Sequence, residues 1–236
     1  MTLPVINAPE YRLKVPSTDE EIKYRPFLVK EEKLLLMAQE TGNENEIYGA
    51  IKKLIEQCCY DAVDVEKMPL FDLEYIFLQI RAKSIGEVST VQITCPDDEK
   101  TKVKVDIDLS KIQVHMDEKH DARIQLTDDI GLLMSYPHLG AVNMIQAGDE
   151  TKQMENMFEM TYDCMYQIWQ GEETFDAMDY SKKEKQEFLE SLSHEQFEKI
   201  QTFFQTMPTV KHEIEVDNPK TGVKSKMTLE GMNSFF

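Results

Sequence analysis

The sequence lacks any long uncharged apolar run, which excludes a helical segment that crosses a bilayer. Its first residues, MTLPVINAPEYRLK, lack the basic start and apolar core of a secretory signal, so we expect synthesis and function in a cytoplasm. No Lys/Arg cluster occurs either. With 26 basic against 44 acidic residues, the net charge of −18 opposes binding to a nucleic acid and favours solubility and basic partner surfaces. We therefore expect neither nucleic acid nor membrane among the partners.

Cysteine is scarce and its spacing is uninformative. Cys58, Cys59, Cys95 and Cys164 form no CxxC or CxxxxC motif, and adjacent cysteines on a helix point in different directions. Cys95-Pro96 resembles the first half of a zinc knuckle, but acidic residues stand where the second cysteine is needed. We expect four reduced and mostly buried thiols, no disulfide framework and no zinc ribbon. A zinc-dependent adaptor that uses Cys95 with a distant ligand stays as an alternative.

Catalytic motifs are absent as well. The sequence has no GxSxG, GxxxxGK[ST], HExxH or GxGxxG. The carboxylate pairs Asp128-Asp129 and Glu172-Glu173 are typical of a solvated surface in so acidic a chain. His115 and His120 flank a charged loop and would bind a metal only with a distant Cys or acid. We predict a protein that is not an enzyme, with no catalytic, cofactor or metal site; a hydrolase that uses scattered acids and His138 is the alternative.

Hydrophobic patterning divides the chain into alternating strand-like and helix-like segments. Four early prolines oppose a long helix near the start, and residues 11–15 and 21–24 alternate as in a hairpin. The predicted fold class is α+β, with helices packed around one or two small antiparallel β-sheets built from hairpins, in one integrated domain; separate lobes are the alternative. The expected segments are an N-terminal arm with a β-hairpin (1–29), a helical segment (30–86), an antiparallel β segment (87–127), a second helical segment (128–208), and a C-terminal β-hairpin with an apolar tail (209–236).

In the second helical segment, the run TKQMENMFEMTYDCMYQIWQ (151–170) carries a broad stripe of methionines and aromatic residues, which we interpret as one helix. Ser181 with Glu184, and Ser193 with Gln196, match the capping box and predict the starts of two further helices.

The C-terminal segment allows a prediction of strand register. If Val216 pairs with Val223, then Glu215 lies opposite Lys224, and a second Glu lies opposite a second Lys. Opposite charges directly across a ladder contribute about 0.2 to 1 kcal/mol each, so this register is favoured over a one-residue shift. The hairpin leaves Met232 to Phe236 as an apolar end, which either folds back into the protein or inserts into another subunit.

Several separate segments carry a resemblance to a known family: PSTDEEIKYRPFLVKEEKLLLMA (16–38), IRAKSIGE (80–87), SHEQFEKIQTFFQTMP (193–208) and the closing NPKTGVKSKMTLEGMNSFF (218–236). They resemble the baseplate hub subunit, or hub assembly protein, of T-even-like contractile-tailed bacteriophages (myoviruses). The resemblance covers nearly the full length, and none of these segments is a catalytic signature.

This resemblance implies a phage protein made in the host cytoplasm and used to build the tail baseplate. Its implied partners are other baseplate hub proteins and the tape-measure protein. Two roles stay open: a structural component of the virion, or a transient assembly chaperone that is absent from it. An apolar tail on an acidic, soluble protein suits either role. The hypothesised partner contacts are Arg25, Pro26, Phe27, Met232, Phe235 and Phe236.

Overall fold

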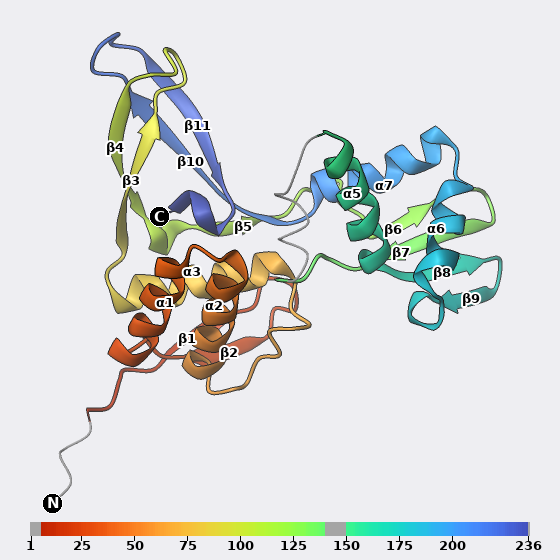
Figure 1. Cartoon of the computed structure of the whole chain (residues 1–236), viewed down its shortest axis with the longest axis horizontal. Coiled ribbons are helices and arrows are strands. Elements are labelled where there is room, and N and C mark those ends of the chain that lie inside the picture. The colour runs from red at the N-terminus through yellow and green to blue at the C-terminus, as the bar shows by residue number, and fades with distance from the viewer. Residues whose placement is uncertain (1–5, 140–149, 236) are drawn as a thin grey trace, which may run out of the picture. The chain divides into compact units, whose positions relative to one another are not determined.

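A computed structural model describes residues 6–139 and 150–235. The chain forms two compact units, where we had predicted one integrated domain (Figure 1). Unit 1 comprises Met1–His115 and Thr209–Phe236, and unit 2 comprises Met116–Pro208. The predicted α+β class is confirmed. The strands of the described residues form four small antiparallel sheets, which is more than the one or two expected.

Unit 1 begins with the predicted hairpin of β1 (Tyr11–Lys14) and β2 (Glu21–Tyr24), in which Tyr11 pairs with Tyr24. Three helices follow: α1 (Val29–Thr41), α2 (Glu44–Cys58) and α3 (Leu70–Ser84). Helix α2 buries one apolar face, on which Leu54, Ile55 and Cys58 are fully inaccessible to solvent. Helix α3 buries residues on most sides, which explains why its apolar residues show weaker periodicity.

Two hairpins complete unit 1. Strands β3 (Val88–Thr94) and β4 (Lys102–Asp108) pair with each other. A 3₁₀ turn, η1 (Leu109–Lys111), then leads to β5 (Gln113–His115). The chain returns after unit 2 as β10 (Thr209–Asp217) and β11 (Lys224–Glu230), which form a sheet with β5 in the order β11-β10-β5, and ends in η4 (Met232–Phe235). The shared core includes Leu78, Ile93, Ile107, Val210 and Phe235.

The predicted β10–β11 register was wrong by two residues. Val216 pairs with Ser225, and Glu215 pairs with Lys226. The inward face is still the predicted one, because a two-residue shift keeps every side chain on its side of the sheet. The reason lies in the loop: the Asn218 N–H donates to the Val223 carbonyl at 2.9 Å, and Gly222, at φ +72°, closes a tight turn back onto Asn218.

Unit 2 is built around a four-stranded sheet in the order β6-β7-β8-β9. Its strands are β6 (Arg123–Gln125), β7 (Ile130–Met134), β8 (Met165–Gln170) and β9 (Glu173–Asp176). Its helices are α5 (Glu150–Cys164), α6 (Lys182–Glu190) and α7 (His194–Thr206), with a 3₁₀ turn η3 (Ala177–Asp179) before α6. Both predicted capping boxes are confirmed, at Ser181 and Ser193.

The helix predicted over 151–170 was wrong in its second part. Helix α5 ends at Cys164, and Met165–Gln170 is a central strand that pairs with β7 on one side and β9 on the other. Residues 128–208 are therefore mixed, and were not helical throughout as expected. Tyr, Ile and Trp in this run favour a strand, and the two neighbouring strands satisfy its backbone groups. None of the helices within residues 6–139 and 150–235 has the length and apolar character needed to traverse a bilayer.

Candidate functional site

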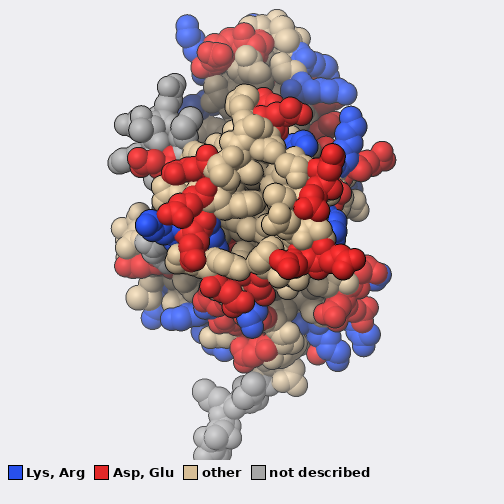
Figure 2. All heavy atoms as spheres, turned by 90° about the vertical axis from the view of Figure 1, so that its right-hand side faces the viewer, with Lys and Arg blue, Asp and Glu red and all other residues tan. Residues whose placement is uncertain are grey.

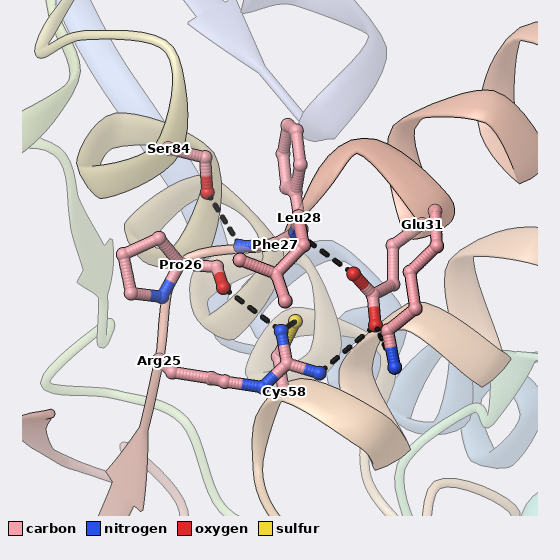
Figure 3. Close-up of polar contacts among 8 residues, drawn as sticks. Arg25, Pro26, Phe27, Leu28, Glu31, Cys58 and Ser84 are labelled. Carbon is pink, nitrogen blue, oxygen red and sulfur yellow. Dashed lines mark hydrogen bonds and ion pairs between the residues drawn. The ribbon is translucent and has the colours of Figure 1, made fainter. Parts of the chain in front are cut away.

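Arg25, the first candidate partner contact, lies where β2 leads into α1. Its main-chain N–H donates to the Cys58 carbonyl at 3.0 Å, which ties this connection to the end of α2. Its guanidinium donates from Nη2 to Glu31 Oε1 at 2.9 Å and from Nη1 to the Pro26 carbonyl at 3.0 Å (Figure 3). The Arg25 side chain is 12% exposed and that of Glu31 only 1%. The pair is therefore a buried ion pair rather than a surface contact.

Glu31 accepts a further hydrogen bond at the start of α1. Its Oε2 accepts the Leu28 N–H at 2.8 Å, which satisfies a backbone donor that the helix itself cannot pair (Figure 3). Burial alone would raise the pKa of Glu31, but the hydrogen bonds from Arg25, the Leu28 N–H and Lys30 hold that pKa below its ordinary value. Glu31 is thus a charged residue that fixes the direction in which α1 leaves the hairpin.

Pro26 and Phe27 are buried beside this ion pair. The Phe27 N–H donates to Ser84 Oγ at 2.9 Å (Figure 3). Ser84 in turn donates to the Ile80 carbonyl of α3 at 2.6 Å. The segment therefore connects the first hairpin to all three helices of unit 1. The structure places these three candidate contacts in the interior of unit 1, where they hold elements of one chain together.

The apolar end folds back into the same unit. Phe235 is completely buried in the core between α3 and the two hairpins, and its carbonyl accepts a hydrogen bond from Ser89 Oγ at 2.8 Å. Met232 is 8% exposed, and its N–H donates to Glu74 Oε1 at 3.0 Å. Burial raises the pKa of Glu74, an effect that the Met232 N–H opposes. Of the two alternatives for the tail, folding back is the one observed, while Phe236 lies outside the described residues.

The four cysteines and His120 are held within the fold. All four cysteines are free and buried, as predicted. Burial raises the pKa of the Cys58 thiol to about 11. The His120 ring lies between hydrogen bonds of 3.0 Å to Thr206 and to Tyr136. Within the described ranges, no three His, Cys, Asp or Glu side chains converge in a way that could hold a metal ion.

Sequence reasoning missed a hollow on unit 2. The hollow has a volume of about 470 Å³ and lies between the sheet and α6. Its lining is largely apolar and comprises Ile130, Met165, Ile168, Gln170, Phe175, Ala177, Tyr180, Glu184, Lys185, Phe188 and Ser191. A strand assignment for Met165–Gln170 would have placed Ile168 and Gln170 on one face of a sheet, and the assignment of this run to a helix concealed that. We refer to this feature as the unit 2 hollow.

Comparison with known families decides what kind of protein this is. The chain matches the family model described as T4 bacteriophage base plate protein over residues 8–236. The chain belongs to this family. The match spans all of unit 2 and, apart from residues 1–7, both parts of unit 1 of this baseplate protein. No curated protein and no solved structure matches the chain.

Proposed function

We propose that this baseplate protein is a component, or an assembly factor, of the tail baseplate hub, and that it acts through protein–protein contacts without catalysis. The observation that supports the proposal is the family match over residues 8–236. The closing hairpin, the helix-to-strand junction at residues 80–87 and the segment 193–208 add the resemblance to hub proteins. Its partners on this proposal are other hub proteins and the tape-measure protein, met first in the host cytoplasm and then at the tail baseplate.

The surface of unit 1 offers contacts other than those first expected. Arg25, Phe27 and Phe235 are used within the chain, so a partner requires different residues. On α1, Val29, Leu36 and Met37 are 78%, 55% and 56% exposed. Apolar side chains that project from one helix are typical of a surface that another protein covers.

The test is recovery of the tagged full chain from phage-infected cells during tail assembly, with identification of the proteins that accompany it by mass spectrometry. Enrichment of hub and tape-measure proteins, relative to the tag alone, is the expected result. Recovery of the chain alone, or with host metabolic enzymes, would overturn the proposal.

The same tag distinguishes the two forms of the role. A hub component remains in purified virions at a fixed ratio to other baseplate proteins. An assembly chaperone accompanies hub intermediates and is absent from finished particles.

A further inference from the structure

The unit 2 hollow is open on one face of the four-stranded sheet. Ile168 and Gln170 lie two positions apart on β8 and therefore point to the same side. Ile130 lies opposite Gln170 on β7, and Phe175 lies opposite Ile168 on β9, which extends the apolar floor across three strands. Phe188 of α6 contributes a wall. The volume, about 470 Å³, falls in the range of about 300–1,000 Å³ that is usual for binding sites.

Carboxylates border this apolar floor. Glu184 lines the hollow itself, and Glu172 and Glu173 follow Gln170 at the β8–β9 turn. Asp179 precedes Tyr180 in the chain, and all four of these acidic residues are exposed. Figure 2 shows an uncharged area of this face surrounded mainly by Asp and Glu side chains. We refer to Glu172, Glu173, Asp179 and Glu184 as the acidic rim.

The neighbouring lysines do not neutralise the acidic rim. Lys182 pairs with Glu159 at 2.6 Å, and Lys183 lies 3.6 Å from Glu187. Lys185 also lines the hollow, where it donates to the Tyr162 carbonyl at 3.2 Å, and it brings one positive charge to this face. Within the part of the chain that the structure describes, no ion pair includes a residue of the acidic rim. The carboxylates of the rim outnumber this lysine, so the rim keeps a net negative charge for an external partner.

We infer that the unit 2 hollow binds a segment of a partner protein in which apolar side chains stand between Lys or Arg residues. The apolar side chains enter the hollow, and the basic residues meet the acidic rim. Acidic ligands, fatty acids and anionic membranes are repelled by the same carboxylates. A second copy of this chain also carries a net charge of −18, so charge opposes self-association through this face.

The first measurement is an NMR titration of the full chain with a synthetic peptide that carries Phe and Leu between two pairs of Lys. One matched peptide has Glu in place of each Lys, and another has Ser in place of Phe and Leu. We expect the methyl signals of Ile130 and Ile168 to shift with the first peptide alone. The affinity should fall with added salt, because salt screens the attraction between exposed charges. At physiological ionic strength this screening acts beyond about 8 Å, the Debye length. Equal binding of the Glu peptide or the Ser peptide would overturn the inference.

Two variants locate the binding. Charge reversal of the rim by Glu172→Lys with Glu173→Lys should lower the affinity for the Lys peptide by about tenfold or more. Gln170→Trp fills the hollow from a strand position that accepts aromatic residues, and should abolish the Ile168 shift. Glu118→Lys with Glu195→Lys changes the net charge equally at exposed positions outside the hollow, and should leave the affinity within about twofold. Equal loss of affinity in this control would show that overall charge, rather than the hollow, binds the peptide.

Analytical ultracentrifugation of the chain without peptide tests whether a second copy of the chain occupies the unit 2 hollow instead. A dimer that Gln170→Trp dissociates would assign the hollow to self-association and overturn the inference. The inference rests on the proposed function only for the setting in which the partner is met. The peptide titration and the recovery from infected cells can therefore fail separately.

Discussion

Asp97 accepts two hydrogen bonds from the side-chain amide of Asn218, at 3.0 and 3.1 Å, although 121 positions separate these residues in the chain. Asn218 is 2% exposed, and its Oδ1 also accepts the Lys220 N–H at 2.9 Å. Thr221 donates to the same carboxylate at 2.5 Å, and these bonds lower the pKa of Asp97, that from Thr221 most. The interaction joins the turn between β3 and β4 to the loop between β10 and β11.

Removal of this link should loosen both hairpins together. We expect Asn218→Ala to lower the free energy of unfolding by about 1 to 3 kcal/mol, because it removes the hydrogen bonds that the buried Asn218 amide donates to the charged Asp97 carboxylate. Asp97→Ala should have a smaller effect in the Asn218→Ala background than in the wild type, measured by urea unfolding. Asp106→Ala, in the same β3–β4 hairpin, removes a bond to Thr90 and should be additive with Asn218→Ala. Additive effects at Asp97 would contradict the link.

Arg25→Ala should destabilise unit 1 by about 3 kcal/mol, because it leaves the buried carboxylate of Glu31 with only the Leu28 N–H and Lys30, whose side chain is 65% exposed. The matched control is Arg12→Ala, which removes an ion pair of the same length, 2.9 Å, to Glu21. Those two side chains are 61% and 53% exposed, so the cost should be at most about 1 kcal/mol. Chemical denaturation of the two variants compares them directly. Equal costs would contradict a special role for the buried pair.

Phe235→Ala should lower the free energy of unfolding by about 3 to 5 kcal/mol, since a fully buried aromatic side chain leaves a cavity. Val223→Ala, at a 45% exposed position of the β10–β11 loop, is the control and should change it by less than about 1 kcal/mol. Deletion of residues 232–236 should likewise lower the melting temperature, which reverses the expectation for a free docking tail. An unchanged melting temperature would return these residues to that role.

Substitution of two glycines by alanine should change the stability of the protein in opposite directions. A Cβ at Gly131 would lie 1.8 Å from Trp169 Cζ2, a clash that a buried indole can relieve only by displacement. We expect Gly131→Ala to cost about 1 to 3 kcal/mol. Gly49 lies inside α2, and its Cβ would meet nothing within 4 Å. Gly49→Ala should therefore stabilise the protein by about 0.5 to 1 kcal/mol, as judged by thermal melting of both variants.

His120 should make stability depend on pH in the weakly acidic range. Burial lowers the pKa of His120, against the opposing influence of Asp121 and Asp117. The unfolded state therefore binds a proton at higher pH than the folded state, near the ordinary value of about 6.5. The stability that neutral His120 provides is present above that value and is lost as the pH falls through the folded pKa. Urea midpoints between about pH 7.5 and about pH 5 should decline less in His120→Gln than in the wild type, and parallel declines would contradict this assignment.

Features that depend on neighbouring residues were predicted correctly from the sequence, whereas features that depend on long-range contacts were predicted poorly. The capping boxes at Ser181 and Ser193 depend on residues three positions apart, and both helices begin where predicted. The β10–β11 hairpin was found with the correct inward face, but its register depended on how Asn218 and Gly222 close the loop. Facing charges alone did not distinguish two registers that place Glu opposite Lys.

The surroundings of the candidate contacts could not be predicted from the sequence, and the reason is physical. Phe235 was singled out because it belongs to an apolar chain end, and Arg25 because it lies in a segment that carries the family resemblance. Their partners, Glu31 on α1 and the core around α3, are set by tertiary packing that no local pattern encodes. The unit 2 hollow was missed because Met165–Gln170 fits a helical stripe, and only pairing with both β7 and β9 makes it a strand.

The division of unit 1 into two sequence segments has a consequence for its synthesis. Strand β5 ends at His115, and its antiparallel partner β10 begins at Thr209, after the whole of unit 2 has been translated. The ribosome therefore exposes all of unit 2 before it supplies β10, β11 and Phe235. Until then, the apolar surface of α3 and the β3–β4 hairpin is not yet covered by β10, β11 and Phe235. Completion of the core is thus tied to residues made after unit 2, so a chain that terminates before β10 lacks a finished unit 1.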